Sequence, residues 1–405
     1  MSRLTKRFID YVKIDTQSDP NSSQTPSTEK QKDLSKLLVK ELTQMGYEAI
    51  LDEYGYVYTK VLSNTTNKVQ ALGLVAHVDT SFDASGTNVT PRIIKAYNGS
   101  EIVLNDNLKM SPKTDPVLNK VIGDDIIVTN GHTLLGADDK AGVAIIMEFL
   151  EFLSENNDFK HGDLYICFTP DEEIGRGADL INYELFKPNF AYTLDGSEVG
   201  EIEYENFNAA SVNITFLGKS IHPGSSKGQM INSQHLAFEF HQMLPTFLNP
   251  AYTEGYEGFN HLTNIIGEVE KTISKYIIRN HDIKLFNQQK ADFKTITNYL
   301  NNKYGYNAVN LEIKDSYFNM YEKIKERMDI IELAKDAIES VGLKPITNPI
   351  RGGTDGARMT YDGMLTPNLG TGSFNFHGPR EFASINQMHQ ALEVVKAIVT
   401  KLTQK

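Results

Sequence analysis

The most constraining feature of this sequence is the alternation of apolar strand-like segments and helical segments in its first half. Residues 71–78 (ALGLVAHV) are almost all apolar, which is typical of a strand buried on both faces of a parallel sheet. Residues 139–155 have the periodicity of a buried helix, and further strand-like segments follow at 163–169 and 190–194. This order predicts an α/β domain with a mostly parallel sheet and helices on both of its faces.

The middle of the chain has a different pattern. From residue 208 the expected order is strand, helix, two strands, helix and strand, which fits a ferredoxin-like α+β unit. The α/β pattern resumes after residue 319 and ends in a closing helix. We therefore expect a discontinuous α/β domain, residues 1–207 and 320–405, interrupted by an inserted α+β domain at residues 208–319.

Composition excludes several classes of protein. The chain has 40 basic and 52 acidic side chains, a net charge of -12 and no basic run, so a nucleic-acid partner is not expected. Cys167 is the only cysteine, which excludes an intramolecular disulfide and leaves a buried, inert thiol as the expectation. No run of about 18 apolar residues predicts a membrane span, and the N-terminus lacks an apolar signal region, so we expect a cytoplasmic protein.

Four short motifs place acids and one histidine where the predicted strands end or a helix begins. Each motif alone has an ordinary explanation as a hydrogen-bonded histidine, a helix N-cap, a solvated loop or a turn. Together they share the carboxyl edge of one sheet, where open α/β folds form their active sites. The motifs are His77-Val78-Asp79, Asp138-Asp139, Asp171-Glu172-Glu173 and Asp195-Gly196.

This set of residue types is suited to metal binding. On a strand, residues i and i+2 point the same way, so Asp79 can orient the imidazole of His77. One histidine with four or five carboxylates suits Zn²⁺, Mn²⁺ or Co²⁺, and carboxylates in such number suit two ions rather than one.

Seven motifs in order resemble the M20 family of dinuclear zinc peptidases. They are HVD, LLGADDKAG, TPDEEIGRG, TLDG, FLGKSIHPGSSKGQMIN, RGGTDGA and NFHGPREFAS. Each motif is modest alone, but seven in this order are highly specific. The resemblance as a whole runs from the N-terminal helix to the closing helix and includes the inserted domain. Ser225, Ser226 and Ser233 replace the Thr, Ala and Ala that we expect in the family, all changes between small residues.

The resemblance implies two Zn²⁺ ions per chain, with Mn²⁺ or Co²⁺ as possible substitutes. Asp138 would bridge both ions, and the bond between Asp138 and Asp139 would be cis. The matching ligands are His77 and Asp195 for one ion, Glu173 and His377 for the other, and Asp138 for both. The residues themselves do not single out His377, because FHGPRE has the composition of an ordinary loop.

The resemblance also implies the catalytic roles. Asp79 matches the residue that orients His77, and Glu172 matches the general base. Three liganding carboxylates leave one positive charge on two Zn²⁺ ions, which favours a bridging hydroxide over water. Glu172 would take the proton of this nucleophile and pass it to the leaving amine.

The activity implied is that of an aminopeptidase releasing the N-terminal residue of tripeptides, in a monomer or homodimer acting on small peptides. The nearest alternative is another M20 activity: a dipeptidase, a carboxypeptidase or an N-acyl amino acid deacylase. A non-catalytic peptide-binding module and a two-metal phosphatase or nuclease are further alternatives. The intact Glu172 disfavours the peptide-binding module, and the acidic motifs disfavour the phosphatase or nuclease.

Three residues outside the metal set are candidates for substrate binding. His222, in a turn of the inserted lid domain, is expected either to stabilise the oxyanion when the lid closes or simply to hold the turn. Arg279 ends a strand of the inserted domain, and Arg351 opens the glycine-rich RGGTDG segment. Each arginine is expected either to bind the C-terminal carboxylate of a tripeptide or to form a structural salt bridge.

Overall fold

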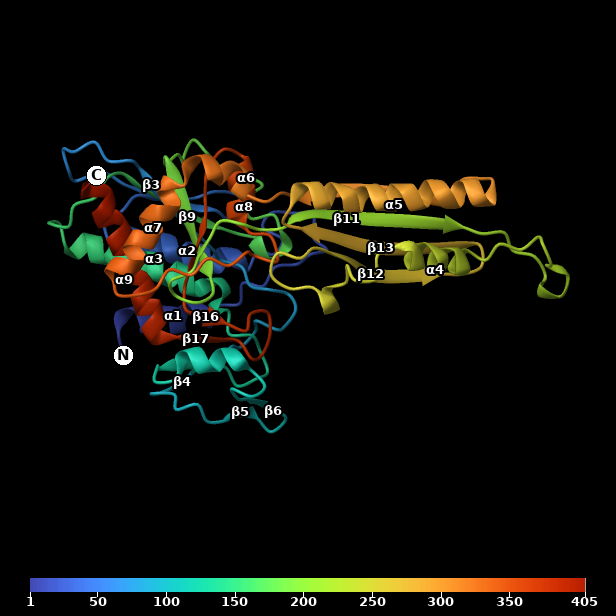
Figure 1. The fold of residues 1–405 in the computed structure, drawn as a ribbon. Coiled ribbons are helices and arrows are strands. Elements are labelled where there is room, and N and C mark those ends of the chain that lie inside the picture. The colour runs from blue at the N-terminus through green and yellow to red at the C-terminus, as the bar shows by residue number, and fades with distance from the viewer. Residues whose placement is uncertain (405) are drawn as a thin grey trace. The chain divides into compact units, whose positions relative to one another are not determined.

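The computed structural model describes residues 1–404, which form two compact units (Figure 1). The first unit comprises Met1–Tyr204, Glu322–Asn348 and the chain from Thr354 onward, and the second comprises Glu205–Tyr321 and Pro349–Gly353.

The bounds of the second unit differ by a few residues from those expected at 208 and 319, and the unit gains residues 349–353. The backbone N–H of Ile350 donates to the carbonyl oxygen of Glu205 at 2.8 Å. This contact joins the returning segment to the start of the inserted chain. Since it depends on two positions far apart in the sequence, the local pattern could not reveal it.

A seven-stranded sheet forms the centre of the first unit, in the order β1-β2-β8-β3-β9-β15-β10. The inner strands β8, β3, β9 and β15 run parallel, and the three others are antiparallel to their neighbours. The predicted parallel sheet is therefore confirmed at its centre. The strands are β1 (Ala49–Leu51), β2 (Val57–Val61), β3 (Leu72–His77), β8 (Leu164–Thr169), β9 (Phe190–Gly196), β10 (Ile202–Glu203) and β15 (Asn368–Gly370).

Helices pack against this sheet. Helix α3 lies on β3 and β9 and contacts α1 and α9, while α7 packs on α9. One residue from each of β3, β8 and β9 packs with Phe186 and with Met359 of α8; these strand residues are Val75, Cys167 and Ala191. Cys167 is buried as expected. The helices are α1 (Arg3–Val12), α2 (Gln31–Gln44), α3 (Ala137–Glu155), α7 (Asp329–Ser340), α8 (Asp355–Tyr361) and α9 (Ile385–Gln404).

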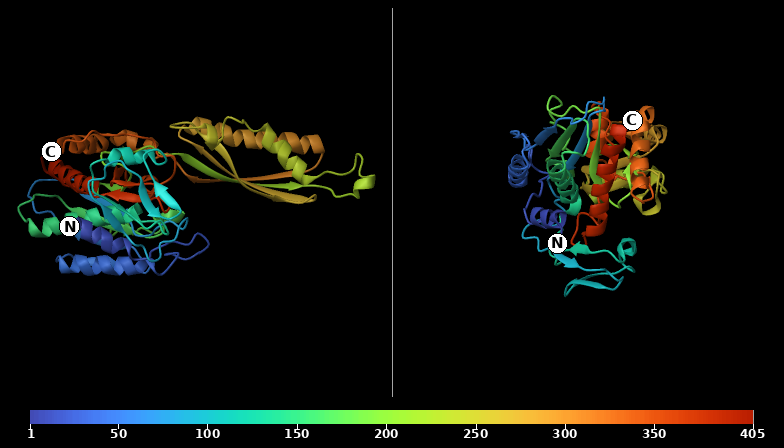
Figure 2. Two further views of the ribbon diagram at one scale, coloured as in Figure 1. Left: turned by 90° about the horizontal axis from the view of Figure 1, so that it is seen from below. Right: turned by 90° about the vertical axis from the view of Figure 1, so that its left-hand side faces the viewer.

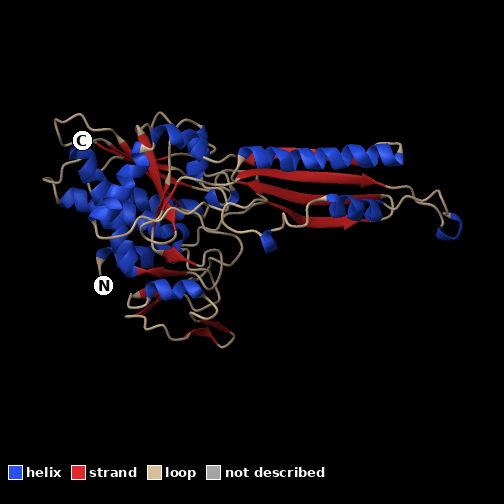
Figure 3. Ribbon diagram, in the orientation of Figure 1, coloured by secondary structure: helices blue, strands red, loops and turns tan. Residues whose placement is uncertain are grey.

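A smaller sheet, ordered β16-β17-β7-β4, accompanies the main one. Phe374 and Phe382 pack in its core with Met110 of the neighbouring β5-β6 hairpin. Figure 3 shows these short strands beside the 3-10 helix Pro116–Val121, in a region whose sequence is rich in turn residues. The strands are β4 (Arg92–Ile94), β5 (Ile102–Asn105), β6 (Leu108–Met110), β7 (Ile126–Val128), β16 (Ser373–Phe374) and β17 (Phe382–Ser384).

The second unit has the predicted βαββαβ order. Its antiparallel sheet runs β12-β13-β11-β14, and both of its long helices lie on one face of that sheet (left panel of Figure 2). Phe216, Phe240 and Phe293 are fully buried between the sheet and the helices. The elements are β11 (Asn208–Leu217), α4 (Ser233–Met243), β12 (Phe259–Gly267), β13 (Lys271–Asn280), α5 (Ile283–Tyr304) and β14 (Val309–Tyr317).

Shorter elements lie in the connections. The RGGTDG segment leads into α8, which the sequence did not indicate because a helix of this length shows little periodicity. Among the described residues, no helix is long and apolar enough to cross a membrane. The remaining short elements are α6 (Tyr321–Ile324) and the 3-10 helices Glu172–Ile174, Pro223–Ser225, Pro250–Tyr252 and Lys325–Arg327.

The position of α3 depends on Gly142. A Cβ atom at this residue would lie 1.9 Å from the backbone oxygen of Leu194 in β9. Only a residue without a side chain allows the helix to approach the strand so closely, and this approach sets where the first turn of α3 meets the sheet edge.

Gly142→Ala should therefore lower the free energy of unfolding by about 1–3 kcal/mol, the usual cost of overpacking. Urea denaturation monitored by circular dichroism measures this change. Gly352→Ala is the matched control, because a Cβ atom there meets no heavy atom within 4 Å. An unfolding midpoint for Gly142→Ala equal to that of the control would contradict the close approach.

Candidate metal centre

The carboxyl edge of the main sheet brings the predicted side chains together. His77 is the last residue of β3, Asp195 is near the end of β9, and Glu172 and Glu173 form a 3-10 turn just after β8. Asp138 comes from the first turn of α3. Because β3, β8 and β9 are parallel neighbours, their ends meet at one edge.

Two groups of possible ligands share Asp138. One comprises His77, Asp138 and Asp195, the other Asp138, Glu173 and His377, and within each group the ligand atoms lie within 4.8 Å of one another. His77 Nε2 lies 2.9 Å from Asp138 Oδ1 and 3.5 Å from Asp195 Oδ1. Asp138 therefore takes part in both groups.

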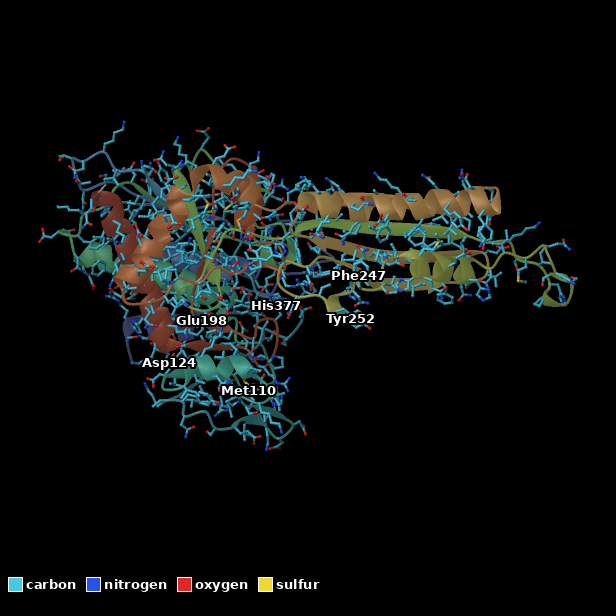
Figure 4. The ribbon with its side chains drawn as sticks, in the orientation of Figure 1. Met110, Asp124, Glu198, Phe247, Tyr252 and His377 are labelled. Carbon is cyan, nitrogen blue, oxygen red and sulfur yellow. The ribbon has the colours of Figure 1, made fainter. Side chains whose placement is uncertain are left out.

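The second group uses the other oxygen of Asp138. His377 Nε2 lies 3.3 Å from Asp138 Oδ2 and 2.9 Å from Glu173 Oε2. His377 is labelled in Figure 4 and lies on the loop between β16 and β17, with a positive φ of 62°. The two oxygens of one carboxylate thus face two different histidines, as a bridging ligand requires.

The charges of these groups fit divalent cations. Burial, followed by the charge of Asp138, raises the pKa of Glu173 to about 8 and the pKa of Asp195 to about 6. Hydrogen bonds to Asp138 and Glu173 raise the pKa of His377 to about 11. Burial is the main cause of the two carboxylate shifts, and the closeness of other carboxylates adds to them, an effect that a bound cation relieves.

The polar atoms also fit such ions. Glu173 Oε1 is buried, and no hydrogen-bond partner for it occurs among the residues that the structure describes. Imidazole nitrogens with carboxylate oxygens form the donor set that Zn²⁺, Mn²⁺ and Co²⁺ accept. The candidate ligands therefore support a metal cofactor.

Asp79 connects His77 to the acidic turn. His77 Nδ1 lies 3.1 Å from the carbonyl oxygen and 3.3 Å from the Oδ1 atom of Asp79. The fully buried carboxylate of Asp79 accepts the backbone N–H groups of Glu172 at 3.0 Å and Glu173 at 3.2 Å. With Nδ1 beside these acceptors, Nε2 of His77 remains directed at the ligand group.

The three consecutive acids do not act as one cluster. The side chain of Asp171 is buried and accepts hydrogen bonds from the backbone N–H of Ser27 and from Nε2 of Gln31, at 2.7 Å each. Asp171 therefore holds the turn against the segment that leads into α2.

Glu172 is the second acid of this turn. Burial, followed by the charge of the nearby Asp195, raises the pKa of Glu172 well above its usual value.

The sequence placed Asp139 and Asp171 among the acids of the metal-binding edge but indicated no separate role for either, and it indicated no role for Glu381. Asp139 follows Asp138 across a cis peptide bond, as predicted. Its carboxylate accepts the N–H groups of His77 at 3.2 Å and Gly142 at 3.1 Å. Asp139 and Asp171 lie in the acidic motifs expected at the sheet edge, whereas the NFHGPREFAS motif of the resemblance is the one signal that pointed to Glu381.

The other candidates lie in the second unit, so their predicted contacts with substrate stay predictions. His222 Nδ1 accepts the N–H of Gly224 at 3.1 Å, which is a contact within its own turn. Arg279 donates through Nη1 to the carbonyl oxygen of Ile278 at 2.9 Å, and its guanidinium lies 5.4 Å from the ring centre of Tyr317.

Arg351 binds protein carbonyls. Its Nη1 donates to the carbonyl oxygens of Gly255 at 2.7 Å and Glu257 at 2.9 Å, and its Nη2 to both oxygens of Thr253. The guanidinium also lies 5.0 Å from the ring centre of Phe207. These contacts hold the 253–257 segment. The structural alternative expected for Arg351 was a salt bridge, but its partners here are carbonyl and hydroxyl oxygens rather than a carboxylate.

Known proteins are similar to this chain in sequence and in fold. The model of peptidase family M20/M25/M40 matches residues 130–401. A peptidase T of Clostridium perfringens is 49% identical, covering 100% of both chains, and a peptidase T of Halothermothrix orenii is 50% identical, covering 98% of each.

Solved structures agree in fold. The aminopeptidase PepT of Bacillus cereus has a TM-score of 0.79 at 23% identity, covering 99% of this chain and 98% of that one. A tripeptidase of Staphylococcus aureus has a TM-score of 0.79 at 22% identity, covering 100% and 98%. A Bacillus subtilis protein described as a dinuclear metal binding peptidase from the M20 family has a TM-score of 0.65 at 12% identity, covering 99% and 98%. With a family model over most of its length and relatives of about half identical sequence, this chain belongs to peptidase family M20/M25/M40.

Proposed function

We propose that this protein is a metal-dependent aminopeptidase that releases the N-terminal residue of tripeptides, with two Zn²⁺ ions as its cofactor. The observation that carries the proposal is the pair of ligand groups that share Asp138. The full-length relatives named peptidase T and the tripeptidase fold support the choice of substrate.

The proposed ligands are divided between two ions. His77 and Asp195 would hold one, Glu173 and His377 the other, and Asp138 both. When bound, the ions would polarise the scissile carbonyl and lower the pKa of water, the two services that such centres supply.

Glu172 is the proposed general base. Its backbone N–H is fixed by Asp79, and it has no place in either ligand group. Its carboxylate would accept the proton of the attacking water and deliver that proton to the nitrogen of the leaving peptide. Burial raises the pKa of Glu172, which favours holding the proton between these two steps.

Asp79 is the proposed positioning residue for His77. Its carbonyl and carboxylate oxygens lie beside His77 Nδ1, so the proton of the neutral imidazole stays on Nδ1. The lone pair of Nε2 is then free for a cation. The same carboxylate orders the backbone of Glu172 and Glu173, so one residue aligns a ligand and the base.

We further propose that a cation of the second unit binds the C-terminal carboxylate of the tripeptide. Local contacts favour Arg279 over Arg351, because Arg351 already donates through both terminal nitrogens to the 253–257 segment. Arg279 donates through Nη1 alone among the described residues. His222 stays the candidate for stabilising the oxyanion.

Removal of metal tests the proposal first. A chelator should abolish hydrolysis of a tripeptide, and Zn²⁺, Mn²⁺ or Co²⁺ should restore it. The assay uses a di-, a tri- and a tetrapeptide with the same N-terminal residue, with chromatography to identify the product. Release of the C-terminal residue, or preference for the dipeptide, would instead indicate another activity of the family.

Glu172→Gln should reduce turnover by about 10²–10⁴-fold, the usual contribution of a general base, because the amide cannot accept the proton. Its metal content, measured by elemental analysis, should equal that of the wild type. Glu173→Gln is the matched control, one residue away, and should lose metal. Loss of metal from Glu172→Gln would show that the two roles are exchanged.

Arg279→Ala should lower kcat/KM for a tripeptide by the equivalent of about 2–5 kcal/mol if the charge pair is buried. The C-terminal amide of the same tripeptide should be affected much less. Arg351→Ala should impair the acid and the amide equally, because it disturbs the 253–257 segment. A selective loss on the acid in Arg351→Ala would reverse this assignment.

A further inference from the structure

Glu381 lies just before β17 and is almost fully buried, with 1% of its surface exposed. Its Oε2 atom accepts the backbone N–H groups of Leu135 at 2.7 Å and Gly136 at 2.8 Å. Its Oε1 atom accepts the N–H of Asp138 at 3.0 Å. One carboxylate thus binds three N–H groups of the segment that presents the shared ligand.

Leu135 and Gly136 lie just before α3, and Asp138 lies in its first turn, where the dihedral angles of Asp138 and Asp139 are not helical, so these N–H groups have no regular partner inside the helix. An N-cap side chain usually accepts such a bond, but the N-cap here is Gly136, which has none and adopts a left-handed conformation with φ of 78°. Glu381 therefore supplies the acceptor from a distant part of the chain. Hydrogen bonds to an ionised carboxylate are stronger than those between neutral groups.

The loop that ends at Glu381 also carries His377. His377 Nε2 contacts Asp138 Oδ2 at 3.3 Å, while Glu381 contacts the backbone N–H of the same residue. Residues 375–381 therefore hold Asp138 by its side chain and by its backbone. Pairing of Phe382 with Val128 anchors the end of the loop in the smaller sheet.

We propose that Glu381 is a positioning residue for the metal centre. By fixing the backbone of residues 135–138, its carboxylate keeps the two oxygens of Asp138 directed at His77 and His377. Since Asp138 is the one residue common to both ligand groups, Glu381 acts on both ions without touching either. The inference rests on the two-metal centre of the proposed function.

The test is a titration of metal-free full-length protein with Zn²⁺ in competition with a chromophoric chelator, which needs no peptide substrate. In Glu381→Gln the amide group keeps the size of the side chain, but its NH₂ faces a backbone donor and cannot accept. We expect the affinity for Zn²⁺ to fall by about 10–100-fold, the usual effect of losing an outer contact of a metal site.

Asp52→Asn is the matched control. Asp52 also accepts two backbone N–H groups, those of Tyr54 at 3.0 Å and Tyr56 at 2.9 Å, in the turn between β1 and β2. Its replacement should leave the affinity for Zn²⁺ unchanged. Urea unfolding of each metal-free variant measures the purely structural cost separately.

Wild-type Zn²⁺ affinity in Glu381→Gln would overturn the proposal, whatever the stability of that variant. If Glu381→Gln does not fold, Glu381→Asp replaces it, since the shorter acid keeps its charge but cannot reach all three donors. Reduced affinity in folded Glu381→Asp supports the proposal, and wild-type affinity overturns it. A wild-type protein that fails to bind two Zn²⁺ ions would overturn the proposed function as well.

Discussion

The repulsion among buried carboxylates is the constraint on which the rest of this structure depends. Asp138, Glu173 and Asp195 crowd around two histidines at the edge of the main sheet. Like charges that are removed from water destabilise a fold unless cations or hydrogen bonds compensate them. The carboxylates that meet at this edge of the sheet are therefore suited to binding cations.

A layer of further acids holds the ligands in place. Asp79, Asp139, Asp171 and Glu381 each direct a carboxylate at backbone N–H groups. Such bonds fix the chain where it leaves a strand or enters a helix, positions that have no regular pairing of their own. The two ligand groups are therefore ordered by contacts that do not involve the ligand atoms, a support that precise metal sites require.

The sequence predicted this site unevenly, for physical reasons. His77, Asp138 and Asp195 lie at strand ends or a helix start, so the period of the apolar residues was enough to place them at one edge. His377 lies on an irregular loop with a positive φ, and only the resemblance to a family indicated it. Asp171 resembled Glu172 and Glu173 in sequence, but its contact with Ser27 joins residues far apart in the chain.

Arg351 illustrates the same limit. A cation in a glycine-rich segment suggested contact with a substrate, which stays a prediction. Its hydrogen bonds to carbonyls of residues 253–257 join positions far apart in the sequence, so the local pattern could not indicate them.

The measurement that tests the account most directly is anomalous diffraction from crystals grown with Zn²⁺. We expect two peaks about 3.5–4 Å apart, the usual spacing in two-metal sites, with the carboxylate of Asp138 between them. One peak should lie beside His77 and Asp195, and the other beside Glu173 and His377. A single fully occupied peak, or two peaks that do not share Asp138, would contradict the account.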